Sequence, residues 1–125
     1  MQPYERFGAW RAAHELALEI HRITKTWPAD ERYGLVSQVR RAAYSVPVNI
    51  VEGRARFGPK EFRRFLDIAW GSLAEVGYAL RYARDLGYLS SAAHEALAAR
   101  CAEVGRPLYA LLRSLHHSAG DRTRS

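Results

Sequence analysis

The stretch FRRFLDIAWGSLAEVGYALRYA, residues 62–83, decides the fold class of this chain. Its apolar residues alternate spacings of four and three without a slip, which is the period of the seam between packed helices. The seam positions are Phe62, Leu66, Ala69, Leu73, Val76, Leu80 and Ala83. Because Gly58-Pro59 precedes the stretch and Gly87 follows it, we expect one helix from about Pro59 to Leu86 that ends at a glycine.

Three further segments carry apolar stripes at helical spacing and predict helices over residues 10–27, 30–56 and 90–115. Asp30 can cap the second of the four helices by accepting a hydrogen bond from a free backbone N–H. Pro47 removes one backbone hydrogen bond there and should kink that helix without ending it. Because short connections return a chain beside itself, these helices predict an all-α, antiparallel, up-down-up-down four-helix bundle with a kinked second helix.

Length and composition predict one domain that needs no disulfide or metal to fold. The bundle should occupy residues 1–117, and the polar, basic segment 118–125 should be a disordered tail. No segment approaches the roughly 18 apolar residues that span a bilayer, and the N-terminus lacks the apolar region of a signal peptide. The lone Cys101 cannot form an internal disulfide. We therefore expect a cytoplasmic protein without a membrane segment.

The helix at residues 62–83 carries a second register beside its seam. Its members are Phe65, Ile68, Ser72, Glu75, Ala79, Tyr82 and Leu86. The two registers together span about 200° of the helix circumference, whereas a surface helix usually buries about 100° or somewhat more. The large apolar members are therefore expected to form a homo-oligomer interface, unless this helix is simply the most buried of the four. They are Phe65, Ile68, Tyr82 and Leu86.

A polar stripe borders the apolar face of the second helix. Together with two residues of the third helix it predicts a structural polar network of Gln38, Arg41, Ser45, Asn49, Glu52, Ser72 and Glu75. Arg41 should pair with Glu52 or Glu75, and Asn49 should satisfy carbonyls that Pro47 frees.

The two carboxylates of that network, Glu52 and Glu75, could instead be an acid and base or metal ligands. However, a nearby arginine keeps carboxylates ionised, and the Glu-x-x-His pairs of a di-metal bundle are absent from the sequence. Nucleophile and phosphate-loop signatures are missing as well. We therefore expect no enzyme activity, no cofactor and no metal.

Basic residues concentrate around the connection between the second and third helices, in a chain of net charge +6. The residues expected to contact nucleic acid are Arg40, Arg54, Arg56, Lys60, Arg63 and Arg64. Arg54 and Arg56 end the second helix, and Lys60, Arg63 and Arg64 begin the third. These five residues should gather at one corner of the bundle. Cations at the start of a helix oppose its dipole, which hints at an anionic ligand such as RNA or DNA. The alternative is a solvated charged face.

Several motifs resemble a known family. The strings ERYGLVSQVRRA (31–42), SVPVNIVEG (45–53), GSLAE (71–75) and LGYL (86–89) are similar to those of the bacterial four-helix-bundle proteins encoded in intervening sequences of 23S rRNA genes. The resemblance implies an antiparallel bundle that assembles as a homopentamer. It also implies kinship with the accessory bundle proteins of diversity-generating retroelements, which bind nucleic acid and a reverse transcriptase. Pro107, inside the predicted fourth helix, departs from the family pattern.

These features lead to two hypotheses. The first is a non-enzymatic homo-oligomer, pentameric as the resemblance implies, that binds nucleic acid, in the first place RNA, through a ring of arginines. The second is a protein-interaction adaptor of the same fold that docks a partner such as a reverse transcriptase. In that case the charge serves only solubility, and the protein has no direct role on nucleic acid.

Overall fold

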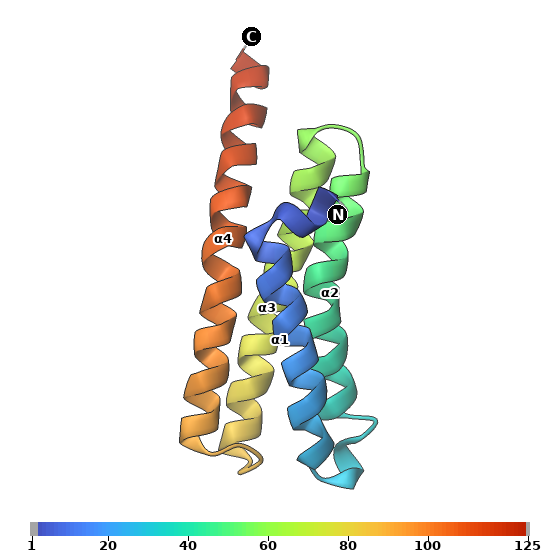
Figure 1. Cartoon of the computed structure of the whole chain (residues 1–125), viewed down its shortest axis with the longest axis vertical. Helices are drawn as coiled ribbons and strands as arrows, with labels where there is room; N and C mark the ends of the chain where they lie inside the picture. Colours follow the sequence, from blue (N-terminus) through green and yellow to red (C-terminus); the bar gives the residue numbers. More distant parts are fainter. Residues whose placement is uncertain (1–2, 125) are drawn as a thin grey trace.

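Four long α-helices make up the protein, as the computed structural model shows (Figure 1). The structure describes the backbone of residues 3–124 and the side chains of residues 4, 5 and 7–115. The long helices are α1 (Gly8–Ile23), α2 (Leu35–Ala55), α3 (Pro59–Asp85) and α4 (Ser91–Arg124). Three short 3-10 helices are η1 (Pro3–Arg6), η2 (Thr24–Thr26) and η3 (Ala29–Glu31). No strand occurs within residues 3–124, so the all-α prediction is confirmed.

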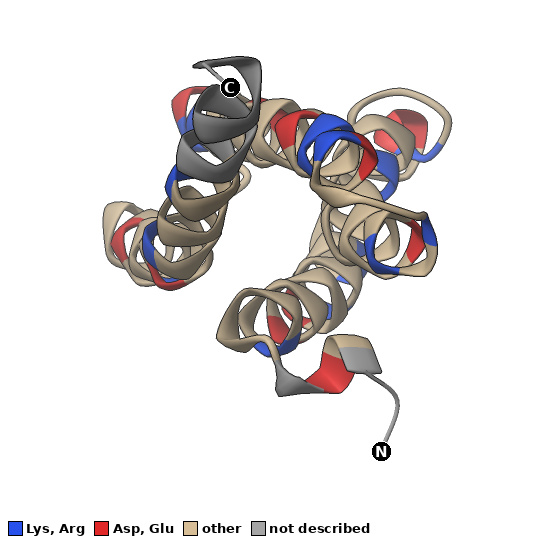
Figure 2. Ribbon diagram, turned by 90° about the horizontal axis from the view of Figure 1, so that it is seen from above, with Lys and Arg blue, Asp and Glu red and all other residues tan. Residues whose placement is uncertain are grey.

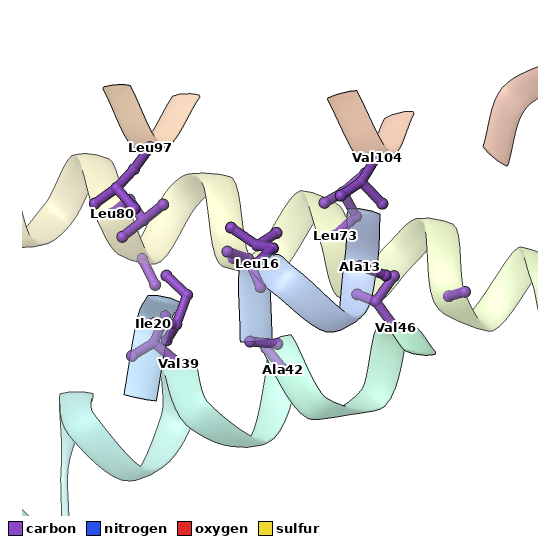
Figure 3. Close-up of a cluster of buried hydrophobic side chains, with 14 of the residues drawn as sticks. Ala13, Leu16, Ile20, Val39, Ala42, Val46, Leu73, Leu80, Leu97 and Val104 are labelled. Carbon is purple, nitrogen blue, oxygen red and sulfur yellow. The ribbon is translucent and has the colours of Figure 1, made fainter. Parts of the chain in front are cut away.

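Each long helix packs against its neighbours in sequence, and α1 also packs against α4. The chain therefore runs up, down, up and down (Figure 1), and the view along the bundle in Figure 2 shows the helices arranged around one core. The side chains in Figure 3 come from all four helices and point toward one another; they include Leu16, Ile20, Val39, Val46, Leu80, Leu97 and Val104. Burying one such side chain contributes about 1.5–3 kcal/mol. The predicted seam of α3 is buried throughout except at Phe62, which is half-buried.

The start of α2 differs from the sequence-based prediction. Asp30 lies in η3 and does not cap the helix, which begins only at Leu35 after Gly34. Glu31 takes the expected role instead, because its Oε1 accepts a hydrogen bond from the Leu35 N–H at 3.3 Å. The prediction for Asp30 is wrong because a separate 3-10 turn and a glycine stand between that residue and the helix.

Both internal prolines lie within continuous helices. α2 continues past Pro47 to Ala55, as predicted, and the size of a bend there stays a prediction. Asn49 does not serve the carbonyl that Pro47 frees, which belongs to Ala43 four residues earlier. Its Nδ2 donates instead to the Ser45 carbonyl at 2.7 Å, the usual partner of the Asn49 backbone N–H.

The glycine predicted at the end of α3 has the expected left-handed conformation. Gly87 has φ 86°, and its N–H donates to the Arg84 carbonyl at 2.9 Å. The N–H of Tyr88 donates to the Ala83 carbonyl at 2.9 Å, which completes a Schellman motif. This ending turns the chain sharply into α4.

α4 extends beyond the other helices at its C-terminal end (Figure 1). Its backbone is helical to Arg124 and thus passes through the segment that the sequence predicts to be a disordered tail. Ser125 and the side chains of residues 116–124 lie outside the described part of the chain, and disorder at 118–125 stays a prediction.

Candidate nucleic-acid interface

The turn between α2 and α3 brings four exposed basic side chains to one end of the bundle. They are Arg54, Arg56, Lys60 and Arg64, and we call this group the basic corner. Arg54 and Arg56 lie at the C-terminal end of α2, while Lys60 and Arg64 lie in the first turns of α3. Figure 2 views the bundle from this end with lysine and arginine in blue. The sequence predicted that these four residues and Arg63 gather at one corner, and the structure brings the four together where α2 ends and α3 begins.

Two arginines of the basic corner share one aromatic ring. The Cζ atoms of Arg56 and Arg64 lie 5.2 Å and 4.6 Å from the centroid of the Phe65 ring. Each cation–π contact at an exposed site contributes about 0.5–1 kcal/mol. Arg64 also pairs with Glu61 at 3.2 Å, whereas the Arg56 guanidinium donates no hydrogen bond to any described residue. The ring therefore holds two cations in place and leaves most of their N–H donors available.

An exposed aromatic side chain stands at the tip of the same turn. Phe57 is 98% exposed and lies between Arg56 and Gly58. Exposed aromatic rings among cations are the platforms on which nucleic-acid bases stack. Sequence reasoning missed Phe57 because helical periodicity identifies only buried apolar residues. The available signal was an aromatic residue between two arginines and a Gly-Pro break.

Arg40 does not join the basic corner. It lies near the start of α2, and 14 residues of helix put it about 21 Å from Arg54. Its Nε donates to Thr24 Oγ1 at 2.8 Å, and its Nη2 donates to the His21 carbonyl at 3.1 Å. Arg40 therefore supplies hydrogen bonds to acceptors at the C-terminal end of α1.

Arg63 also points away from the basic corner. It is half-buried and lines a groove of about 310 Å3 between α3 and α4, whose other lining residues are Asp67, Trp70, Tyr109, Leu112 and Arg113. Arg63 and Arg64 are consecutive, so on a helix their side chains diverge by about 100°.

The predicted polar network is smaller than expected. Ser45 Oγ and Ser72 Oγ lie 2.8 Å apart and join α2 to α3, and Asn49 Nδ2 donates to Ser45 Oγ at 2.9 Å. Arg41 does not pair with a carboxylate of the network, because its Nη2 donates to Ser37 Oγ at 2.9 Å. The other predicted members, Gln38, Glu52 and Glu75, are exposed and form no ion pair or hydrogen bond with a described side chain.

The predicted oligomer interface is divided between the core and the surface. Phe65 is only 7% exposed and belongs to the α2–α3 packing, so it offers little surface to a second chain. Ile68, Tyr82 and Leu86 are 42%, 46% and 46% exposed. We call these three residues the α3 apolar strip.

Three other features bear on function: the lone thiol, the arrangement of possible metal ligands and the apolar character of the helices. Burial raises the pKa of the Cys101 thiol to about 11, so this thiol is protonated at neutral pH and is a poor nucleophile. Among the described residues, no three His, Cys, Asp or Glu side chains lie together as metal ligands do. Within the same part of the chain, no helix combines the length and the apolar character that a membrane span requires.

Comparison with known proteins identifies the family. The model of the family described as 23S rRNA-intervening sequence protein matches residues 5–110. The fold is similar to that of a crystal structure from Bacteroides thetaiotaomicron, a protein of unknown function from the S23 ribosomal protein family. That likeness has a TM-score of 0.78 at 20% identity and covers 84% of this chain and 95% of the other. No curated protein matches the chain. Because the family model spans most of its length, the chain belongs to the 23S rRNA-intervening sequence protein family.

Proposed function

We propose that this protein is a non-enzymatic homo-oligomer that binds nucleic acid, RNA in the first place, through its basic corner. The observation that carries the proposal is the geometry around Phe65, where two arginines stack on one ring beside the exposed Phe57. The two guanidinium groups lie within about 10 Å of one another, so a phosphate bound at the corner is attracted by both. Arginine suits this role because its planar fork of donors matches the oxygens of a phosphate.

The position of the corner supports an anionic ligand for a second reason. Lys60 lies in the first turn of α3, where the helix dipole disfavours a cation by a few tenths of a kcal/mol, and Arg64 follows in the second turn, where the effect has largely decayed. One acidic residue, Glu61, offsets part of this cost through its pair with Arg64. A bound polyanion would offset the rest.

Self-association would multiply these contacts. The α3 apolar strip leaves Ile68, Tyr82 and Leu86 exposed along one face of the helix, and a second copy of the chain could cover them. In a closed ring, such as the pentamer that the family resemblance implies, each subunit adds one basic corner. Phosphate contacts then add up through counterion release.

The proposal is tested by titrating a structured RNA at two salt concentrations. Wild type should bind more weakly at the higher salt, and reversal of Arg54, Arg56 and Arg64 to glutamate should remove binding at both. The matched control reverses Arg11, Arg81 and Arg100, which are exposed elsewhere and change the net charge equally. Equal loss in both triple variants, or no loss in the first, would contradict a localised site.

A second candidate function, the protein-interaction adaptor, is favoured by a different surface. A groove of about 480 Å3 between α1 and α2 exposes Leu18 and Tyr44 beside Trp10. Its largely apolar lining suits a protein partner, for example a reverse transcriptase, better than a phosphate backbone. A partner that stays bound after nuclease treatment and at high salt, and is lost in Leu18→Asp, would support this function.

A further inference from the structure

The groove between α3 and α4 exposes an aromatic pair that the bundle core does not need. The rings of Trp70 and Tyr109 lie 5.9 Å apart at 46°, and the two residues are 41% and 55% exposed. Trp70 lies on α3 and Tyr109 on α4, and both rings lie outside the hydrophobic core. A small polar residue at either position would therefore leave the core packing intact. Flat aromatic surface that stays open to solvent offers a platform for another planar ring.

The same groove contains a cation with an unused donor. Arg63 Nε is shielded from solvent and has no hydrogen-bond partner among the described residues. The other guanidinium nitrogens of Arg63 form no hydrogen bond with a described residue either, so they remain available to an acceptor in the groove. Arg113 supplies a second guanidinium to the lining. Asp67, the one acidic side chain of the lining, forms no ion pair with either arginine.

We propose that this groove binds one unpaired nucleotide of the strand that the basic corner holds. The base stacks against Trp70 and Tyr109, and a phosphate oxygen accepts hydrogen bonds from the two arginines. Asp67 repels phosphate and so favours placement of the base, whose N–H groups can donate to it, on its own side of the groove. This inference rests on the proposed function.

Continuity along α3 connects the two surfaces. Lys60 and Arg64 belong to the basic corner, and Arg63, between them in sequence, lines the groove. Measured along the axis of α3, the groove lies within two helical turns, about 11 Å, of the basic corner, and a strand that leaves the corner reaches it by turning about 100° around the helix. A base in a duplex cannot enter, because both of its faces are already stacked. The protein should accordingly prefer single-stranded to double-stranded RNA of the same sequence.

The test compares a 12-nucleotide single-stranded RNA with its duplex and with free AMP. Wild type should bind the single strand more tightly than the duplex, with quenching of tryptophan fluorescence that is absent in Trp70→Phe. Tyr109→Leu should lower single-strand affinity about 5- to 150-fold, the loss expected for one stacked base. Its affinity for the duplex should not change.

Two further variants separate stacking from folding. Tyr109→Trp keeps a stacking surface and should retain single-strand affinity. Tyr78→Leu removes an exposed tyrosine from another face of α3 and should leave every affinity unchanged. Thermal melting followed by circular dichroism checks that the variants fold.

The outcomes distinguish this inference from the proposed function. Equal affinity for single strand and duplex, unaffected by Tyr109→Leu but lost on reversal of the basic corner, would overturn the groove site and leave the corner standing. Tight binding of AMP that persists after that reversal would overturn it too, by showing a mononucleotide site. If reversal of the corner left RNA binding intact, the proposed function itself would fail.

Discussion

The two ends of this bundle use arginine in opposite ways. At the end where α1 meets α2, Arg40 donates hydrogen bonds within the protein, to Thr24 Oγ1 at 2.8 Å and to the His21 carbonyl at 3.1 Å. At the end where α2 meets α3, Arg56 and Arg64 are held by the Phe65 ring. Figure 1 shows these two connections at opposite ends of the molecule.

The α1–α2 end is also joined to the neighbouring α3–α4 connection. Tyr88 donates its hydroxyl proton to Glu31 Oε2 at 2.9 Å, and its ring lies 5.9 Å from that of Trp27. The α2–α3 end instead leaves Phe57 and four cations exposed. One end is therefore closed by internal polar contacts, and the other is suited to an external anion.

The largest effect on stability is expected where α2 and α3 approach one another beneath the basic corner. A Cβ atom on Gly53 would lie 2.8 Å from Phe65 Cβ and 3.0 Å from a ring carbon of Phe62. Gly53→Val should therefore lower the free energy of unfolding by about 1–3 kcal/mol and weaken RNA binding by displacing Phe65. Urea denaturation measures the first effect.

Gly71→Ala is the matched control for Gly53, because a Cβ atom at Gly71 has open space around it. Alanine should stabilise that exposed helical position by about 0.5–1 kcal/mol. A Gly53→Val protein as stable as wild type would show that the two helices are not held as closely as described.

A somewhat smaller loss is expected from Thr24→Val at the closed end. Thr24 is 2% exposed, and its Oγ1 accepts the hydrogen bond from Arg40 Nε. Valine keeps the shape and leaves the arginine donor unpaired, so the free energy of unfolding should fall by about 1–2 kcal/mol. Thr26→Val, at an exposed hydroxyl nearby, should change it far less. Equal effects of the two variants in chemical denaturation would contradict an internal role for Arg40.

The different roles of arginine at the two ends of the bundle show which parts of the structure can be predicted from the sequence. Helical periodicity identified the buried faces correctly, because Leu66, Val76 and Leu80 repeat at the spacing of the seam. Periodicity could not assign Arg40, since its partners lie 16 and 19 residues away on another helix. It placed Phe65 on the surface for the same reason. Phe65 is buried because its Cβ lies against Gly53 of α2 and its ring lies beside Arg56, contacts that a pattern within one helix does not contain.

A pH-dependent effect is expected at the closed end. The hydrogen bond to Glu31, followed by burial and the nearby carboxylates, raises the pKa of Tyr88 above its ordinary value of 10.0. Because the folded state favours the protonated phenol, the contribution of this bond is complete below pH 10 and is lost as the pH rises through the raised pKa. Tyr88→Phe should therefore lower the melting temperature near neutral pH, with a difference from wild type that shrinks above pH 10. A constant difference across this range would exclude the predicted titration.

The smallest effect on stability is expected from Arg56→Gln at the open end. Only the cation–π contact with Phe65 is lost, which contributes about 0.5–1 kcal/mol or less at an exposed site. Under the proposed function RNA affinity should fall nevertheless, because the guanidinium of Arg56 donates no hydrogen bond to any described residue and is available to a phosphate. A calorimetric scan and an RNA titration of the same sample compare the two effects. A large loss of stability with unchanged affinity would reverse the roles that we assign to the two ends.

The most direct test of the account is the salt dependence of RNA binding. Each phosphate contact contributes about 0.7–0.9 to the slope of log affinity against log salt concentration. Replacement of the four cations of the basic corner by glutamine should lower that slope by about 3 per chain, whereas Arg40→Gln at the closed end should leave it unchanged. A slope that stays the same without the corner, or falls equally on loss of Arg40, would contradict the division of roles between the two ends.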